Sequence, residues 1–173
     1  MDALTCILTR RSIRKFSGEP IPDDQLHTIL RAGMSAPTAM NTRPWQFVVI
    51  KNPETLQAVT VAHPHAKMLP QAGCGILVCG DITRNASLEY LTEDCSAAIE
   101  NMLLAAHALG LGAVWLGIHP REERVNALRA LAKLPDGICP IGLIAVGVPD
   151  ETRDAPDRFE VDKVHWEVWQ SDR

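Results

Sequence analysis

The sequence has little of what marks several common classes of protein. Only 5% of its 173 residues are aromatic, and its five cysteines are scattered, with no C-x-x-C pair. This cysteine pattern does not form a disulfide framework and favours reduced thiols in a cytoplasm. We also expect no export signal, because the first basic residues follow a very short apolar stretch instead of preceding it.

An excess of positive charge is absent as well. The chain carries 17 Lys and Arg against 21 Asp and Glu, a formal net charge of −4, which argues against a general binder of nucleic acids or anionic membranes. Its longest apolar run, residues 102–118, is shorter than the ~20 residues that span a bilayer, and Gly110 and Gly112 interrupt it. We interpret this run as a buried helix followed by a buried strand.

Neither an internal repeat nor a linker rich in Ser or Gly divides the chain. We therefore expect one domain over residues 1–173, with an acidic arm from about residue 150. Helices are predicted near residues 3–9, 22–33, 53–61, 92–109 and 120–135, and strands at 45–50, 75–79, 113–118 and 140–148. Because the elements mix without a regular βαβ rhythm, the predicted fold class is α+β.

The predicted helix over residues 92–109 is apolar or small on nearly every side. Ile99 and Met102 mark its apolar face, while Ala97 and Ala105 keep much of the remaining circumference small. Such a helix is buried on several sides, either at the centre of the protein or in an interface between subunits.

Several motifs of other enzyme classes are missing or misplaced. Gly110 and Gly112 end a helix and precede a strand, the reverse of a dinucleotide-binding loop, and the chain has no Walker loop or G-x-S-x-G elbow. His63 and His65 could form half of a metal site, but no second cluster lies at metal-ligand spacing. We interpret this pair as a surface turn and predict no metal.

Positive charge gathers near the start of this acidic chain. Arg10, Arg11, Arg14 and Lys15 lie close together, with Ser12 between them. A solvated arm would explain the cluster. A phosphate site would explain it too, because guanidinium groups bind phosphate oxygens in a bidentate manner and a serine hydroxyl adds a donor.

The loop over residues 35–45, SAPTAMNTRPW, is the second unusual segment. Two prolines stiffen it, while Thr38, Asn41 and Arg43 present hydrogen-bond donors. An asparagine offers both a donor and an acceptor, which suits the edge of a heterocycle.

Four segments follow one another along the chain: RRSIRKF, APTAMNTRPWQFVVI, AHALGLGAVWLGIHP and PIGLIAVGVP. In this order and at these spacings they resemble the nitroreductase family of flavoproteins, over nearly the whole chain. The resemblance implies an α+β sandwich with a mostly antiparallel central sheet flanked by helices. It further implies an intertwined homodimer with FMN bound non-covalently at the subunit interface and NADH or NADPH as electron donor. The chain resembles the compact members of the family.

The resemblance also implies individual site residues. Arg10 and Ser12, with Arg11 beside them, match positions that bind the FMN phosphate, and Arg158 matches a late phosphate-binding arginine. Arg14 matches a cationic position at the pyrimidine edge of the flavin.

Two further segments complete the implied site. Leu116 and Gly117 match a segment whose backbone faces the flavin N5 region. The loop that reaches the flavin held mainly by the other subunit matches Pro37, Thr38, Ala39, Asn41 and Arg43. There are three departures from the family pattern. Arg43 stands where Gln is usual, Pro156 stands where a second late cation often sits, and the flavin-edge asparagine of some members has no evident counterpart near residues 63–66.

The implied function is an FMN-dependent NAD(P)H oxidoreductase, which transfers a hydride through flavin N5 to a nitroaromatic, quinone or similar acceptor by a ping-pong mechanism. The flavin would carry the chemistry, so no residue is catalytic in the strict sense, and Arg14 would stabilise negative charge on the reduced ring. Three alternatives stay open: a flavin carrier or sensor without turnover, a nucleic-acid binder that uses its N-terminal cations, and a family variant that fragments flavin, dehalogenates or oxidises azolines.

Overall fold

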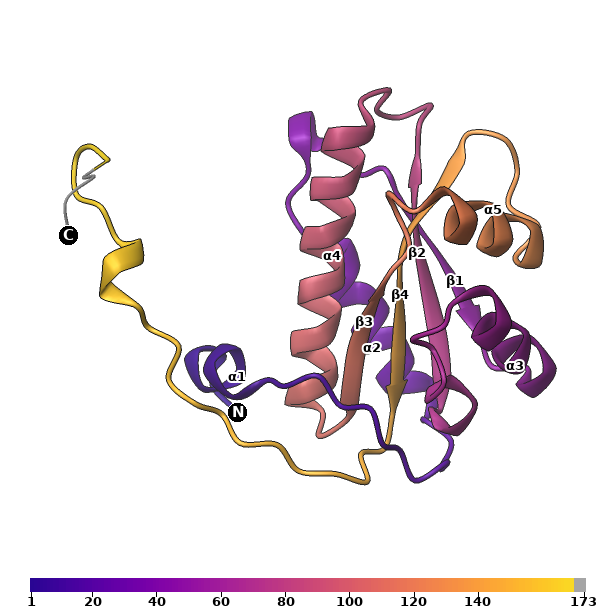
Figure 1. The fold of residues 1–173 in the computed structure, drawn as a ribbon, viewed down its shortest axis with the longest axis horizontal. Helices are drawn as coiled ribbons and strands as arrows, with labels where there is room; N and C mark the ends of the chain where they lie inside the picture. The colour runs from indigo at the N-terminus through magenta and orange to yellow at the C-terminus, as the bar shows by residue number, and fades with distance from the viewer. Residues whose placement is uncertain (170–173) are drawn as a thin grey trace.

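The computed structural model describes residues 1–169 and shows one sheet between two layers of helices (Figure 1). The α-helices of this part are α1 (Ala3–Thr9), α2 (Asp23–Met34), α3 (Pro53–Ala62), α4 (Leu88–Ala108) and α5 (Glu122–Leu131). The strands are β1 (Trp45–Ile50), β2 (Cys74–Asp81), β3 (Gly112–Gly117) and β4 (Ile138–Gly147). Short 3₁₀ turns are η1 (Ala39–Asn41), η2 (Leu69–Gln71) and η3 (Val161–Lys163).

The strands form one antiparallel sheet in the order β1-β2-β4-β3. β2 and β4 lie at its centre and are buried along most of their length. β1 and β3 are the edges, and Ser12 extends the β3 edge through a parallel bridge to Ala113. This arrangement confirms the predicted α+β sandwich with a mostly antiparallel central sheet flanked by helices.

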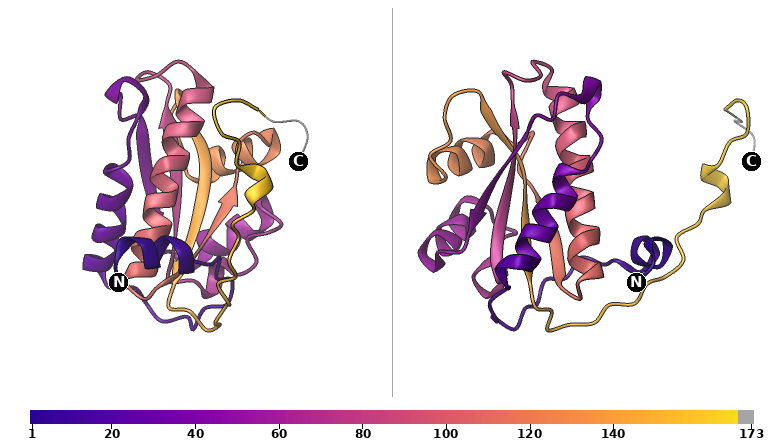
Figure 2. Two further views of the ribbon diagram at one scale, coloured as in Figure 1. Left: turned by 90° about the vertical axis from the view of Figure 1, so that its left-hand side faces the viewer. Right: turned by 180° about the vertical axis from the view of Figure 1, so that it is seen from behind.

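Each face of the sheet has its own hydrophobic core, because side chains alternate between the faces along a strand. α2 and α4 cover one face, where Ile76 and Val78 of β2 pack with Met102 of α4. α3 and α5 cover the other face, where Leu77 packs with Leu128 of α5. The two side views in Figure 2 show these layers. The candidate site described below uses residues from both helix layers: α4 on one face of the sheet, and α3 and α5 on the other.

Two helix starts differ from the prediction. α4 begins at Leu88 rather than near residue 92, because Ser87 caps the helix and accepts a hydrogen bond from the backbone N–H of Tyr90 at 3.3 Å. α5 begins at Glu122, after Arg121 as its N-cap, so Pro120 lies in the preceding turn and not in the first turn of the helix.

The five cysteines are all free thiols, as predicted. Cys74, Cys79 and Cys95 are fully buried, and burial raises the pKa of each thiol to about 12. They therefore serve as small apolar side chains in the core.

After β4 the chain leaves the sheet as an extended arm that passes α1, and the last part of this arm that the structure describes lies away from the sheet (Figures 1 and 2). Several large apolar side chains of this arm are exposed: Phe159, Val161, Trp166, Val168 and Trp169. Over residues 1–169, no helix is long and apolar enough to cross a membrane.

Candidate functional site

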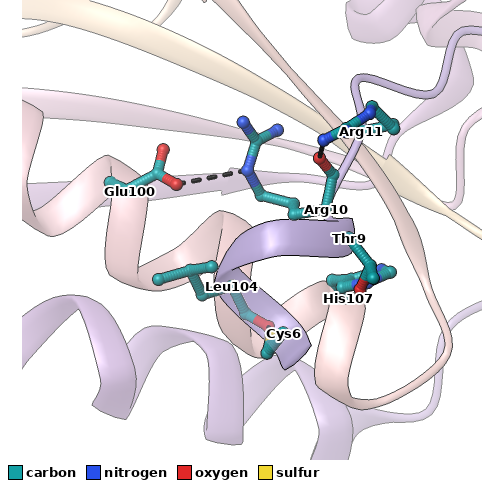
Figure 3. Close-up of polar contacts among 7 residues, drawn as sticks. All are labelled: Cys6, Thr9, Arg10, Arg11, Glu100, Leu104 and His107. Atoms are coloured by element: carbon teal, nitrogen blue, oxygen red, sulfur yellow. Dashed lines mark hydrogen bonds and ion pairs between the residues drawn. The ribbon is translucent and has the colours of Figure 1, made fainter. Parts of the chain in front are cut away.

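The N-terminal arginines lie where helix α1 docks on helix α4 (Figure 3). The thiol of Cys6 donates to the carbonyl of Leu104 at 3.2 Å, and the side chains of Thr9 and His107 are hydrogen-bonded at 2.9 Å. These contacts fix the end of α1, so the residues that follow it, Arg10 and Arg11, leave the helix at a defined place.

Each of these two arginines is held by a different part of the fold. Nε of Arg10 forms an ion pair with Oε1 of Glu100 on α4 at 3.2 Å. Nε of Arg11 donates to the backbone carbonyl of Asp154 at 2.9 Å, and its Nη2 donates to the carbonyl of Pro156 at 3.3 Å. Arg11 thus binds the C-terminal arm alongside the end of α1.

A pocket of about 440 Å³, open to solvent, lies beside this contact between α1 and the arm. Its lining includes Arg10, Arg11 and Arg158, together with Ile7, Leu8, Ala155, Pro156 and Asp157. Three cations that lie far apart in the sequence therefore meet at one pocket. Guanidinium groups arranged in this way suit the oxygens of a phosphate group, and Asp157 adds a single negative charge to the lining.

Ser12 and Arg14 lie further along the same segment. Ser12 is half-buried against β3, and neither residue lines the arginine pocket. The carboxylate of Glu151 accepts hydrogen bonds from the backbone N–H groups of Arg14 and Lys15. The bond from Arg14 is the main cause that lowers the pKa of Glu151, and the side chain of Arg153 and the bond from Lys15 lower it further. The backbone is therefore anchored here, while the Arg14 side chain is exposed.

The loop around η1 has an unusual backbone. Met40, Asn41 and Arg43 all have left-handed φ angles, of 53°, 55° and 47°, a conformation that costs free energy in residues other than glycine. Nε of Arg43 donates to Oδ1 of Asn41 at 3.0 Å, and the backbone N–H of Arg43 donates to Oγ1 of Thr38 at 3.1 Å. The loop is thus held in shape by its own side chains.

Asp94 anchors this loop to helix α4, which the sequence patterns did not predict. Its Oδ1 accepts a hydrogen bond from the backbone N–H of Ala39 at 2.8 Å, although the residue is only 5% exposed. Its Oδ2 is buried and has no hydrogen-bond partner in residues 1–169. A carboxylate on an otherwise apolar helix face was the available signal for such an anchor.

Helix α1, which lines the arginine pocket, and the η1 loop lie toward opposite ends of α4 (Figure 1). Asp94, which holds the loop, and His107, which contacts Thr9 of α1, are about 20 Å apart along the helix axis, since each residue advances it by about 1.5 Å. Within one chain, the structure brings Arg10, Arg11 and Arg158 together but keeps Asn41 and its loop away from them.

The remaining predicted positions lie at the end of β3. Leu116 is buried, whereas Gly117 is exposed, and a Cβ built on Gly117 would meet no atom within 4 Å. The carbonyl of Gly117 accepts hydrogen bonds from Nε2 of His63 at 3.0 Å and from Nη1 of Arg124 at 2.8 Å. Neither donor was predicted from the sequence.

The interpretation of His63 as part of a surface turn was therefore wrong. The residue is 1% exposed, because it ends α3 with its ring directed at Gly117. Only His65 and Pro64 of that segment are exposed. In the part of the chain that the structure describes, no three His, Cys, Asp or Glu side chains are placed to hold a metal ion.

Comparison with known proteins agrees with this architecture. A model of the nitroreductase family matches residues 7–70 and 60–148. An Archaeoglobus fulgidus protein, provisionally named NADH dehydrogenase/NAD(P)H nitroreductase, is 43% identical over 172 residues, which are 97% of this chain and 99% of that protein. The crystal structure of a Bacteroides thetaiotaomicron protein with the same provisional name is 39% identical, with a TM-score of 0.92 over 96% of this chain and 98% of that one.

A third relative was solved with a cofactor. The structure of a Desulfovibrio desulfuricans protein, provisionally named a nitroreductase, is a complex with FMN. It is 32% identical, with a TM-score of 0.84 over 98% of this chain and 99% of that one. The family model, the identities and the antiparallel sandwich all agree, and the chain belongs to the nitroreductase family.

Proposed function

We propose that this protein is an FMN-dependent NAD(P)H oxidoreductase. The observation that carries the proposal is the convergence of Arg10, Arg11 and Arg158 on one pocket of about 440 Å³. FMN ends in a single phosphate, and this set of guanidinium groups suits such a group. The relative solved in complex with FMN supports the choice of cofactor.

The residues present fit the flavin as well as its phosphate. Arg10, Arg11 and Arg158 would hold the phosphate, with Ser12 nearby as a neutral donor. The open space at Gly117 would let a planar ring approach the backbone closely. Arg14 would stabilise negative charge at the pyrimidine edge. When bound, FMN supplies an N5 atom that accepts a hydride and returns it.

We further propose that the working unit is a homodimer in the cytoplasm. One chain keeps Asn41 and its loop away from its own arginine pocket, so a second chain would supply that loop. An apolar groove of about 430 Å³ on one chain, lined in part by Ile7, Leu104 and Ala105, suits a subunit contact. The exposed apolar side chains of the arm support the same assembly. The free cysteines suit a reducing compartment.

The reaction we propose is ping-pong transfer from NAD(P)H to a nitroaromatic, a quinone or a similar acceptor. Because the donor and the acceptor would use one pocket in turn, steady-state rates at several acceptor concentrations should give parallel double-reciprocal lines. Intersecting lines would indicate a ternary complex and contradict the scheme.

Identification of the released flavin tests the cofactor directly. The protein should purify yellow, and chromatography of its heat-released cofactor should give FMN; recovery of FAD alone would refute the assignment. A bound flavin that NAD(P)H does not bleach would favour a carrier or sensor. A colourless protein whose affinity for nucleic acid falls steeply as the salt concentration rises would favour a nucleic-acid binder.

A further inference from the structure

The backbone of Gly117 is directed at the open edge of the sheet. β3 pairs with β4 on one side only, and on its other side the carbonyl of Ala113 accepts a hydrogen bond from the N–H of Ile13 at 3.0 Å. The N–H and C=O of a strand residue point to the same side, and that side alternates along the strand. Gly117, four residues after Ala113, therefore also directs both groups away from β4.

Two side chains from the layer formed by α3 and α5 meet at the carbonyl of Gly117. His63 is the C-cap of α3, and its Nε2 lies 3.0 Å from the Gly117 oxygen. Arg124 lies in the first turn of α5, and its Nη1 lies 2.8 Å from the same oxygen. One carbonyl thus has two donors, one of them charged.

The contact at Nδ1 of His63 shows that its other ring nitrogen, Nε2, is the donor to Gly117. The backbone N–H of His65 points to Nδ1 of His63 at 3.3 Å, so Nδ1 accepts and Nε2 carries the hydrogen that binds Gly117. Burial, more than any other cause, lowers the pKa of His63, while the bond to Gly117 opposes that shift. The neutral ring with its hydrogen on Nε2 satisfies both contacts.

Two donors hold the carbonyl of Gly117, and these contacts restrict the backbone at this residue. Glycine loses more conformational freedom on folding than any other residue, so its peptide orientation depends on its partners. A Cβ built on Gly117 would project from a face of the sheet and would meet no atom within 4 Å. The C=O of Gly117 belongs to the peptide group that follows the residue, and its N–H belongs to the group that precedes it. His63 and Arg124 hold the first group, and the pairing of Leu116 with Leu143 of β4 holds the residue from the other side. Between these two anchors the N–H of Gly117 keeps a defined direction.

We propose that His63 and Arg124 are positioning residues for the flavin: they hold the edge N–H of Gly117 in the direction that an acceptor atom of the ring requires. This inference rests on the proposed function, which puts this backbone beside flavin N5. Oxidised N5 accepts a hydrogen bond, whereas reduced N5 carries a hydrogen of its own. A fixed N–H here therefore favours oxidised FMN over reduced FMN and holds the midpoint potential down.

Removing one donor should loosen this N–H and weaken binding of oxidised FMN about tenfold, with less effect on reduced FMN. For a two-electron couple, that ratio corresponds to a rise in midpoint potential of about 30 mV. Arg124→Ala is the main variant, because the residue is only half-buried and belongs to neither hydrophobic core. His63→Ala should act in the same direction, and His63→Gln, whose amide can replace the donor, should restore much of the wild-type potential.

The chain offers matched controls for charge and for position. Arg121 lines the same surface pocket of about 430 Å³ as Arg124, but no hydrogen bond joins it to Gly117 among the contacts described for residues 1–169. Arg121→Ala therefore removes the same charge without releasing the carbonyl. His65→Gln changes the exposed neighbour of His63 while keeping the backbone N–H that binds Nδ1.

The experiment measures the FMN dissociation constant and the midpoint potential of the holoenzyme for all five variants, with thermal unfolding as a check on the fold. The inference predicts a rise in potential for Arg124→Ala and none for Arg121→Ala. Equal potentials in those two variants would overturn it, even where wild-type protein binds FMN and is reduced by NAD(P)H. Wild-type protein that binds no FMN would instead overturn the proposed function, and this inference with it.

Discussion

Replacing Gly117 with alanine should separate the stability of the fold from the binding of the cofactor. The added methyl group would meet no atom within 4 Å, and the backbone of Gly117 is outside the left-handed region. The free protein should therefore accept the change without strain. Alanine also has less freedom than glycine in the unfolded chain, so the free energy of unfolding should stay the same or rise by about 0.4–1 kcal/mol.

FMN binding should respond in the opposite direction. A flavin ring against this backbone would have to move away from the methyl group, and overpacking of this kind costs about 1–3 kcal/mol. The FMN dissociation constant should then increase roughly 5- to 150-fold. Fluorescence titration of the apoprotein measures this change, and thermal unfolding without FMN measures stability.

Gly112→Ala is the control for this experiment, since it changes the other end of the same strand. Its Cβ would lie 2.7 Å from Cγ2 of Ile13, so this variant should lose stability even without FMN. Unchanged FMN affinity in Gly117→Ala, in a protein that keeps its fold, would refute the placement of the flavin beside this residue.

The remaining predictions concern charge, assembly and pH. Arg10→Ala should weaken FMN binding by roughly one to two decades, the equivalent of a charge-assisted contact of about 1.5–3 kcal/mol, whereas Arg14→Ala should mainly lower the midpoint potential. FMN titration and potentiometry measure the two effects, and the reverse result would mean that the roles of the two arginines are exchanged. Ala105→Glu should abolish dimerisation and yellow colour together in light scattering and absorbance, because it would bury an unpaired carboxylate; a folded monomer that keeps FMN would contradict a shared site. The pKa of His63 is lowered from its ordinary value of 6.5, so below about pH 6.5 the unfolded chain binds more protons than the folded one and stability should fall as the pH falls. Urea denaturation at several pH values should show a smaller loss for His63→Gln, and an identical pH profile would rule out this origin.

Elements that depend mainly on their own residues were predicted closely from the sequence. The strand expected at residues 45–50 is β1 (Trp45–Ile50), whose aromatic and β-branched residues favour an extended chain. The start of α4 was missed because most of its first turn, LEYL, is exposed, and only Leu91 of that turn is buried. There the cap from Ser87 determines where the helix begins.

The parts of the site that depend on distant contacts were harder to predict. The pattern H-P-H suggests a turn, and nothing near His63 in the sequence indicates that its partner is the carbonyl of Gly117. The contacts of Glu100 and Asp94 could not be predicted for the same reason. Each residue meets its partner only after α4 packs against α1 and the η1 loop. The arginine cluster was recognised through charge and family resemblance, but the meeting of Arg10 with Arg158 required the fold.

The most direct test of the account is a pair of anaerobic half-reactions on the purified holoenzyme. NADH or NADPH is added until the bound FMN is bleached, the nucleotide is removed by gel filtration, and a quinone or nitroaromatic is then added to the reduced protein. The account predicts that the yellow colour disappears in the first step and returns in the second, with no nucleotide present. A flavin that stays oxidised with either nucleotide, or that reoxidises only while nucleotide is bound, would contradict it.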